Sequence, residues 1–335
     1  MRVLMAATNL AGQTSILASC LREVGVDALS LVFTKNNFGY DADILLPLSD
    51  YPRIIKYFIK VWYFLRAVLG FDIMHFHGGS TLFKGFFDLP LYRLLGKKTV
   101  MHFHGRDVRN PQIIIARGRG GKIPPIQTPD QIARLEFLRK YVDKFIVSTP
   151  DLLELVPEAT YLPLSAGEEW FSELDPKSSN EVFTIVHAPT SRSIKGTKQV
   201  LAAVGNLKRK GYKIKLLLVE NVLNDKVREF YEQADVFVDQ LLVGWHGVAA
   251  IENMAIGNPV VSYIKPELRK KYAPDLPIIQ SNKDNIEEVL ETLLGNRELL
   301  MKIGAASKEY AKRNHSPRVN ARKLIEIYNS IFSHS

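Results

Sequence analysis

The stretch that decides the fold is GWHGVAAIENMAIGNPVV, residues 244–261. It has the order of a loop, a short helix, a glycine stop at Gly257 and a new strand. Glu252 is the one charged residue on the helix, which indicates a buried element, and a buried carboxylate needs a partner. Gly247 begins the helix and lets a ligand approach the free backbone N–H groups of its first turn. The stretch therefore predicts a ligand site at a helix N-terminus.

Strand-like apolar runs alternate with helical periodicity along the whole chain. Candidate strands are 3–7, 29–33, 73–77, 100–104, 145–148, 183–187, 215–219, 236–239 and 259–263. Helices are expected between them, for example over 198–208, 224–232 and 286–294. Near-continuous apolar strands separated by helices favour parallel sheets covered on both faces, so the expected class is α/β with doubly wound, Rossmann-like sheets.

The series of strands restarts after a polar segment, which suggests two domains. A length of 335 residues already exceeds one typical core. Residues 172–181 are polar and contain a proline, so we place the domain boundary there. The predicted domains are 1–170 and 171–315, and 316–335 forms a final helix with no strand after it.

The composition is that of an ordinary soluble globular protein, with 46% hydrophobic and 24% charged residues. Cys20 is the single cysteine, so no disulfide forms within the chain, and a reducing cytoplasmic location is favoured. Residues 2–8 form too short an apolar run for a signal peptide, and no run of about 18 uncharged apolar residues exists. We therefore expect no membrane-spanning helix.

Positive charge is concentrated in one region of the chain. Residues 51–140 contain 16 Lys and Arg against 5 Asp and Glu, a net charge of +11, whereas the whole chain carries +9. Such a patch can bind nucleic acid, phospholipid or a phosphorylated substrate. Because no nucleic-acid-binding motif accompanies the charge, no nucleic-acid partner is expected.

Two segments of this basic region are candidate binding surfaces. Residues 51–69 place Arg53, Lys56 and Lys60 on one face at helical spacing, among aromatic residues, as in helices that lie on an anionic membrane. The alternative is a core-facing helix with a solvated basic stripe. Residues 117–122 form a basic, glycine-rich loop that could hold a phosphorylated or lipid-linked acceptor, and the alternative there is a solvated loop.

The stretch 244–261 resembles the donor-binding signature of family 4 glycosyltransferases, Glu-Gly-Phe-Gly-x4-Glu-Ala-Met-Ala-x-Gly-x-Pro-Val. Gly247, Glu252 and Gly257 match it together, whereas Gly244 replaces the first glutamate of the Glu-x7-Glu pair. The resemblance implies the GT-B fold, in which two Rossmann-like domains face an interdomain cleft and the last helix crosses back to the first domain. It also implies metal-independent sugar transfer with retention of configuration.

The resemblance assigns roles to residues of this stretch. In the family, the second glutamate binds the ribose of the donor nucleotide and the helix start holds the diphosphate. These roles fall on Glu252 and on Gly247 and Val248. The first glutamate of the family contacts the donor sugar, and in its absence Asp239 and Gln240, which end the preceding strand, are the nearest polar candidates, although Asp239 could equally cap a turn. His246 is a further candidate for contact with the donor sugar or the acceptor.

A second element, HAPTSRSIKGT over residues 187–197, is similar to the Lys-Gly element that opens a helix in the family. Lys195 matches the lysine that neutralises the donor diphosphate, and fixed cations lower the barrier as that group leaves. The family's arginine lies six residues earlier, where this chain has Pro189, and Arg192 is the substitute cation in the same loop. The alternative is a solvated basic turn.

Two His-x-His pairs, His75 with His77 and His102 with His104, end candidate strands, and alternation puts each pair on one sheet face. The second pair resembles the family's His-Gly element, whose histidine lies beside the reacting sugar. His104 is therefore the predicted catalytic histidine, and His77 is a further contact with the sugar or acceptor. His75 and His102 are expected in the sheet interior. Four histidines could suggest zinc, but no cysteine accompanies them and no metal is expected.

The first turn, residues 8–13, contains Gly12, which we expect to face the donor because enzymes of this fold use a glycine-bearing loop there. Catalysis is assigned to His104, Lys195 and Glu252. The predicted protein is a retaining glycosyltransferase that uses a UDP- or GDP-type sugar donor and a glycan, lipid-linked or other hydroxyl acceptor, without a cofactor.

The expected setting is polysaccharide, glycolipid or glycan assembly for the cell envelope, in the cytoplasm or at the inner face of the cytoplasmic membrane. Two alternatives remain open from the sequence. One is a nucleotide-sugar epimerase or phosphorylase of the same fold. The other is a non-catalytic nucleotide-sugar-binding subunit that supports another transferase.

Overall fold

The computed structural model describes residues 1–335 except 36–37, 120–121, 173–180 and 334–335. The chain divides into two compact units. Unit 1 consists of Met1–Asn110, Pro125–Ser165 and Pro317–Ser335, and unit 2 consists of Pro111–Pro124 and Ala166–Ser316. The segment Pro111–Pro124 lies within the range that the sequence assigned to the first domain, yet it belongs to unit 2. The polar stretch in which we placed the boundary lies largely outside the described residues.

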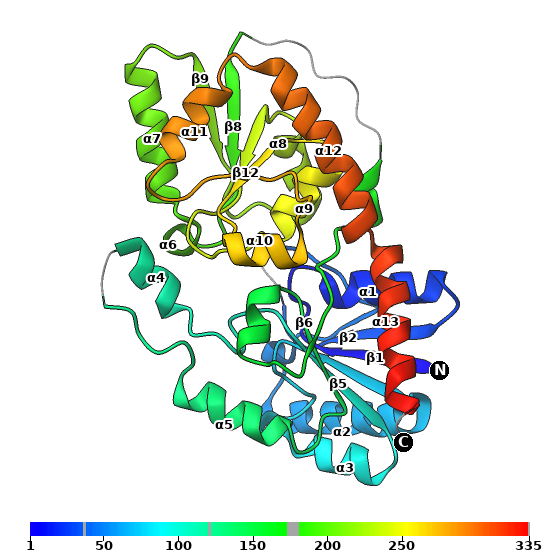
Figure 1. Ribbon diagram of the computed structural model, residues 1–335. Helices are drawn as coiled ribbons and strands as arrows, with labels where there is room; N and C mark the ends of the chain where they lie inside the picture. Colours follow the sequence, from blue (N-terminus) through cyan, green and yellow to red (C-terminus); the bar gives the residue numbers. More distant parts are fainter. Residues whose placement is uncertain (36–37, 120–121, 173–180, 334–335) are drawn as a thin grey trace. The chain divides into compact units, whose positions relative to one another are not determined.

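Unit 1 is built on a seven-stranded parallel sheet (Figure 1). Its strands are β1 (Arg2–Ala7), β2 (Asp27–Val32), β3 (Ile44–Leu45), β4 (Ile73–His77), β5 (Lys98–Phe103), β6 (Lys144–Val147) and β7 (Thr160–Tyr161). They lie in the order β3-β2-β1-β4-β5-β6-β7. The strand order therefore reverses between β1 and β4, which is the point where doubly wound sheets bind ligands.

Helices cover both faces of this sheet. They are α1 (Gln13–Glu23), α2 (Arg53–Gly70), α3 (Asp88–Leu94), α5 (Pro129–Leu138) and α13 (Pro317–Phe332). On one face, Leu17 of α1 and Leu324 of α13 share a buried cluster with Met5 of β1. On the other face, Tyr92 of α3 and Leu135 of α5 pack against strand residues that point the opposite way. Burial on both faces explains why the strands read as continuous apolar runs.

Unit 2 has a five-stranded parallel sheet in the order β12-β11-β10-β8-β9. The strands are β8 (Phe183–His187), β9 (Ile214–Leu218), β10 (Val236–Val238), β11 (Val260–Ser262) and β12 (Ile279–Gln280). The helices are α4 (Gln112–Arg119), α6 (Arg192–Lys195), α7 (Thr197–Arg209), α8 (Asn224–Tyr231), α9 (Val248–Ala255), α10 (Pro266–Tyr272), α11 (Ile286–Leu293) and α12 (Arg297–His315). Here the strand order reverses between β8 and β10.

The sequence prediction of the strands is confirmed, and their ends differ by no more than about two residues from those expected. The helices predicted over 198–208, 224–232 and 286–294 are α7, α8 and α11. The two-residue strands β3, β7 and β12 were not among the candidate strands, because two residues carry no periodicity. The α/β class with two doubly wound parallel sheets is confirmed.

Helix α9, which carries the motif of the opening stretch, is fixed by close backbone packing. Gly257 follows it with φ of 85°, and α12 passes over this point at Gly304. A Cβ atom on Gly304 would come within 2.3 Å of the Gly257 carbonyl oxygen, so a glycine is required there. Asn258 adds a side-chain hydrogen bond to Asn253 of α9 at 2.8 Å.

No helix within the described part of the chain combines the length and the hydropathy that crossing a bilayer requires.

Candidate functional site

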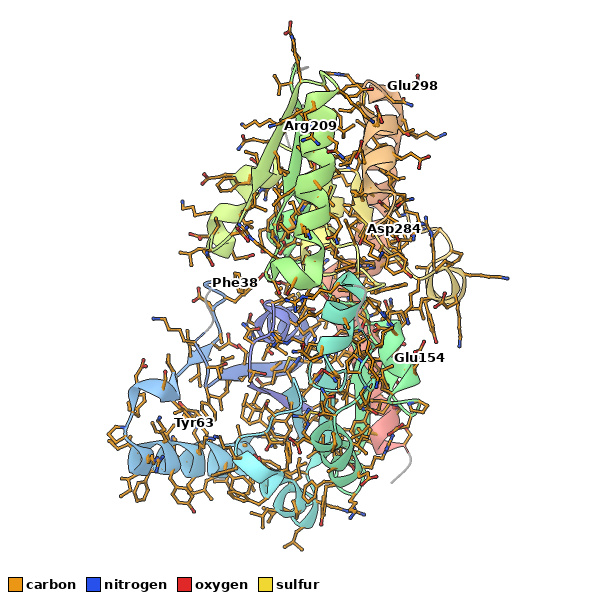
Figure 2. The ribbon with its side chains drawn as sticks, turned by 90° about the vertical axis from the view of Figure 1, so that its left-hand side faces the viewer. Phe38, Tyr63, Glu154, Arg209, Asp284 and Glu298 are labelled. Atoms are coloured by element: carbon orange, nitrogen blue, oxygen red, sulfur yellow. The ribbon has the colours of Figure 1, made fainter. Side chains whose placement is uncertain are left out.

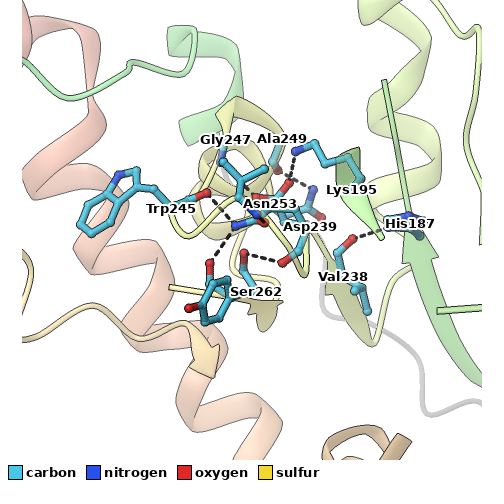
Figure 3. Close-up of polar contacts among 12 residues, drawn as sticks. His187, Lys195, Val238, Asp239, Trp245, Gly247, Ala249, Asn253 and Ser262 are labelled. Atoms are coloured by element: carbon cyan, nitrogen blue, oxygen red, sulfur yellow. Dashed lines mark hydrogen bonds and ion pairs between the residues drawn. The ribbon is translucent and has the colours of Figure 1, made fainter. Parts of the chain in front are cut away.

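The carboxyl edge of the unit 2 sheet brings together the two motifs that the sequence singled out. Helix α6 and the start of α7 follow β8, and the loop before α9 follows β10 (Figure 3). These are the two strands on either side of the switch in strand order. Residues 247–249, at the start of α9, are partly exposed, whereas the rest of the helix is buried. The first turn of α9 is therefore open to a ligand.

Asp239 is the centre of this edge. Its Oδ1 accepts a hydrogen bond from Nζ of Lys195 at 2.5 Å, and its Oδ2 accepts one from the backbone N–H of Gly247 at 3.0 Å. The side chains are 1% exposed for Asp239 and 15% exposed for Lys195. A lysine and a helix N-terminal N–H are also the contacts that hold a phosphate. The carboxylate therefore occupies an anion-binding position at the start of α9, rather than reaching out as the sugar contact we expected.

The geometry around Lys195 leaves no spare room. A Cβ atom on Gly247 would lie 3.3 Å from Nζ of Lys195, so the glycine permits the close approach that the sequence suggested. Gly196 follows Lys195 with φ of 80°, which ends α6 and starts α7 in a new direction. The backbone N–H of Leu241 donates to the Lys195 carbonyl at 3.1 Å. Lys195 is thus held by its backbone as well as by its side chain.

His187, the last residue of β8, was not predicted as a site residue, but its hydrogen bonds stabilise this arrangement. Burial lowers the pKa of His187 to about 4, so its imidazole is neutral at pH 7. Its Nδ1 lies 2.7 Å from the Val238 carbonyl, which can only accept, and therefore Nδ1 carries the proton. Nε2 then accepts from the hydroxyl of Thr197 at 2.9 Å. The pair links the end of β10 to the first residue of α7.

Glu252 is buried, with 4% of the residue exposed. Its carboxyl oxygens form no hydrogen bond with any other described residue. Burial, with a smaller contribution from the charge of Glu169, raises the pKa of Glu252 to about 8. The group is therefore protonated at neutral pH and has unused hydrogen-bonding capacity one turn from the start of α9.

The loop before α9 disfavours a side chain at position 244. Gly244 has φ of 98°, and a Cβ atom there would lie 2.8 Å from the side chain of Lys265. Gln240 fixes the loop, because its Nε2 donates to the carbonyls of Trp245 and Tyr263, both at 2.7 Å. A glutamate at position 244 would need a strained backbone and a displaced lysine.

His246 lies in the interior of unit 2, with 3% of the residue exposed. Its ring stacks on Trp245 at 5.1 Å between centroids and meets His315 edge-on at 5.2 Å. Burial lowers the pKa of His246 to about 3, and neither ring nitrogen makes a hydrogen bond of good geometry. A contact with sugar or acceptor, which the sequence suggested, would require His246 to leave this aromatic packing.

Arg192 does not join Lys195, although both lie on α6. Its Nε donates to Glu220 at 2.8 Å, and the side chain is 59% exposed. It lines a pocket of about 390 Å³ in unit 2 together with Arg119 and Lys198. Arg119 ends helix α4, so the first three residues of the expected basic loop 117–122 are helical. Residues 120–121 lie outside the described residues.

The histidine pairs of unit 1 form one stack, as the alternation predicted. His75 and His77 on β4 have ring centroids 4.6 Å apart, and His102 and His104 have theirs 4.4 Å apart. Nδ1 of His77 lies 3.0 Å from Nε2 of His104. Three of the four residues are at most 2% exposed, and His104 alone is partly exposed. His77, predicted to contact the sugar, is instead buried behind His104.

His104 is held by Ser148 and Asp107 in addition to His77. Its Nδ1 lies 2.6 Å from the Ser148 hydroxyl, and its backbone N–H donates to the carboxylate of Asp107 at 2.8 Å. The same carboxylate accepts from the N–H of Gly105 at 2.7 Å. Burial lowers the pKa of all four histidines, so the stack is neutral at pH 7. Ser148 and Asp107 were not predicted, although an aspartate just after a strand end is a common turn signal.

The histidine stack is the place in unit 1 where described side chains could hold a metal. One ring nitrogen from each of His75, His77 and His102 lies within 4.8 Å of the others. The rings of His75 and His77 are almost parallel, with 7° between their planes. Because a metal bonds in the plane of an imidazole, these two rings would have to rotate before they could share an ion.

Gly12 lies at the switch point of the unit 1 sheet. It precedes α1 with φ of 74°, and a Cβ atom there would lie 2.8 Å from the ring of Tyr40. The same loop is tied to β4, because the Thr8 hydroxyl donates to the His77 carbonyl at 3.1 Å. The glycine is therefore required by both conformation and space.

Comparison with solved structures places the fold among nucleotide-sugar enzymes. Sucrose-phosphate synthase from Thermosynechococcus elongatus has a TM-score of 0.69 at 14% identity, with all of both chains covered. Anabaena HepE in complex with UDP and glucose has a TM-score of 0.67 at 9% identity, over 98% of this chain and 100% of that one. The epimerase MnaA of S. aureus, solved with UDP, has a TM-score of 0.56 at 14% identity, over 99% and 98%.

No family model matches the sequence, and neither does any curated protein. The similarity to solved structures establishes the class of fold. The chain has the GT-B fold, with two Rossmann-like domains in tandem.

Proposed function

We propose that this protein is a glycosyltransferase that moves a sugar from a nucleoside diphosphate sugar to an acceptor hydroxyl. The observation that carries the proposal is the anion position at the start of α9, formed by Lys195 and the Gly247 N–H and lying on the same helix as the unpaired carboxyl of Glu252. HepE and MnaA, which share the fold, were each solved with UDP. A donor diphosphate and ribose match these two features in chemistry.

The donor diphosphate would replace the carboxylate of Asp239 on Lys195. It carries more negative charge than one carboxylate, and it can also accept from the remaining N–H groups of the first turn, including that of Val248. As the bond to the sugar breaks, negative charge grows on the diphosphate, and the fixed ammonium of Lys195 stabilises it. Asp239, once released, is free to accept a hydrogen bond from a sugar hydroxyl.

Glu252 would bind the ribose. Two vicinal hydroxyl groups can donate to one carboxylate, which supplies the hydrogen bonds that this buried group lacks. Hydrogen bonds to the charged form lower a carboxyl pKa, so ribose binding would release the proton that Glu252 holds at neutral pH. Nucleotide binding would then strengthen as the pH rises towards about 8.

His104 would orient the sugar as a neutral imidazole. The reaction would proceed with retention, and the acceptor proton would pass to the departing phosphate on the same face of the sugar. The protein then contributes orientation and charge stabilisation rather than a nucleophile. We assign Gly12 to the same donor side and Arg192 to a second phosphate or to the acceptor. We also propose that the transfer requires no metal ion.

Isothermal titration of the protein with UDP, GDP and ADP, followed by their sugars, tests the proposal. We expect one nucleoside diphosphate to bind selectively and Lys195→Ala to weaken that binding at least tenfold. A ligand that binds the folded state also raises the melting temperature, which gives an independent readout. If no nucleoside diphosphate binds, the proposal is wrong.

An epimerase is the second candidate, because MnaA shares the fold. An epimerase converts the nucleotide sugar without an acceptor, so NMR of the sugar after incubation with protein alone separates the two activities. The transferase requires transfer to an added hydroxyl acceptor. Binding of the nucleotide sugar without epimerisation and without transfer to an acceptor would instead indicate a binding subunit.

A further inference from the structure

Helix α2 presents a stripe of large apolar side chains to solvent. Its six members are between 43% and 79% exposed and are Ile54, Ile55, Phe58, Trp62, Leu65 and Leu69. At about 100° of rotation per residue, they fall within an arc of about 100° on one side of the helix. Single exposed apolar residues are ordinary on protein surfaces, but a continuous stripe of this size marks a binding surface. Figure 2 shows side chains projecting outward from α2, which is labelled at Tyr63.

Helix α3 extends the same surface. Its exposed apolar residues are between 41% and 80% exposed and are Phe87, Leu91, Leu94 and Leu95. The two helices are joined by Phe83, whose ring lies 6.3 Å from that of Tyr57 on α2 and 4.6 Å from that of Phe87. We call the exposed apolar residues of both helices the α2–α3 surface.

The opposite side of α2 is already anchored in unit 1. Ala67 is completely buried, and the ring of Phe64 packs 4.9 Å from that of Tyr92 on α3. Nζ of Lys60 lies 5.8 Å from the centre of the Phe83 ring, and burial lowers the pKa of Lys60. The sequence-based alternative, a core-facing helix with a solvated basic stripe, agrees with this anchored side, but the most exposed stripe of α2 is apolar. None of the six stripe residues belongs to the buried cluster of unit 1.

Exposed positive charge accompanies the α2–α3 surface at Arg53 and Arg66 of α2, whereas Lys60 lies on the anchored side. Helix α2 carries Arg53, Lys56, Lys60 and Arg66 and no acidic residue. The acid of α3, Asp88, is buried and accepts hydrogen bonds from the Thr81 hydroxyl at 2.7 Å and from the N–H of Leu82 at 3.1 Å. Its charge is thus turned inward, while Arg93 on the same helix is exposed.

We propose that the α2–α3 surface docks unit 1 onto an anionic lipid bilayer. Apolar and aromatic side chains would enter the boundary between headgroups and acyl chains, and the flanking cations would contact lipid phosphates. Self-association by a two-fold axis would place like-charged edges against one another, which disfavours a dimer through this face. The inference goes beyond the proposed function and does not depend on it, since lipid binding can be measured without a sugar donor.

Tryptophan fluorescence gives a direct test, because the chain has three tryptophans and one is exposed. Trp62 is 59% exposed, whereas Trp170 and Trp245 are 2% and 3% exposed. We expect the emission of the intact protein to shift to shorter wavelength with vesicles that contain about 30% phosphatidylglycerol in phosphatidylcholine. Pure phosphatidylcholine should give a much smaller shift. Trp62→Phe should abolish the shift while the protein still floats with the anionic vesicles.

Vesicle flotation with matched variants tests the contact surface. The double variant Phe58→Ser with Leu69→Ser should weaken binding at least tenfold, because each side chain contributes about one order of magnitude when buried. The control is Met301→Ser on α12, which also removes an exposed apolar side chain, 76% exposed, and should leave binding unchanged. Arg53→Glu with Arg66→Glu should remove the preference for anionic lipid.

Three results would overturn the proposal. One is equal flotation of the parent and the Phe58–Leu69 double variant. Another is equal binding to neutral and anionic vesicles. The third is a dimer by light scattering that becomes monomeric in the double variant, which would identify a second copy of the chain as the occupant. Nucleotide titration of the same samples shows separately whether the proposed function holds.

Discussion

The two sheets end in edges of opposite character. At the unit 2 edge, Lys195 and Asp239 carry opposite charges and form a nearly buried ion pair. Glu252 lies one turn into helix α9, which begins at this edge. At the unit 1 edge, the stack around His104 is neutral, since burial lowers the pKa of each histidine. A charged edge suits a phosphate, whereas a neutral edge suits a sugar or an acceptor hydroxyl. The contrast predicts different effects for substitutions in each edge.

The largest expected effect is that of Lys195→Ala, about 300-fold in turnover, because a charge that stabilises a leaving group contributes about 2–4 kcal/mol. Nucleotide affinity should fall as well. The matched control is Arg192→Ala on the same helix, whose guanidinium pairs with Glu220 at the surface and should matter less than tenfold. Comparable losses of turnover in the two variants would show that Lys195 and Arg192 do not have different roles.

His104→Ala should lower turnover about 100-fold, because the imidazole would orient the sugar. UDP affinity should change less than threefold, since the nucleotide is assigned to unit 2. Steady-state kinetics and titration on one preparation provide both values. A loss of nucleotide affinity equal to that of Lys195→Ala would contradict the division between a charged and a neutral edge.

Gly244→Glu introduces a glutamate where the signature that this stretch resembles has one, and should destabilise the protein by about 2 kcal/mol. The backbone there has φ of 98°, and the new Cβ would meet the side chain of Lys265 at 2.8 Å. Chemical denaturation measures the change, with Gly205→Ala in α7 as the control, where the nearest atom to a Cβ is 3.8 Å away. A stable and faster Gly244→Glu enzyme would show that the loop can adopt the family conformation.

The smallest effect concerns Glu252 and pH. The folded protein keeps the Glu252 proton up to about pH 8, whereas an unfolded chain releases it near 4.5, so this group's contribution to stability falls as pH rises between those values. Glu252→Gln lacks this loss, so its stability relative to the parent should rise steadily between pH 4.5 and pH 8 and should differ little at pH 4.5. A parallel pH dependence in both proteins would place the raised pKa elsewhere.

Local pattern was sufficient for much of the fold. Most of the strands and the last helix follow from periodicity, and the placement of Lys195 and Gly247 at the same sheet edge follows from the rule that ligands bind at strand ends. The same-face placement of His102 and His104 follows from alternation along a strand.

Contacts between residues far apart in the sequence could not be predicted from local pattern. The pairing of Arg192 with Glu220 joins residues 28 positions apart, and Ser148 reaches His104 across 44 positions. Burial of α2 was also undetermined, because its apolar residues extend over more than one side of the helix and do not indicate which side faces the core. The left-handed backbone at Gly244 depends on the Gln240 side chain that fixes its loop.

In the proposed phosphate site, the carboxylate of Asp239 would compete with the ligand for Lys195. It is tethered beside Lys195 and therefore acts at a high effective concentration, which a single weak contact cannot overcome. Chloride or a monophosphate would rarely displace it, whereas a diphosphate that is also anchored through its ribose would do so. In the proposed site the aspartate would therefore set a threshold, so that abundant small anions would leave the site unoccupied and a complete nucleotide would open it.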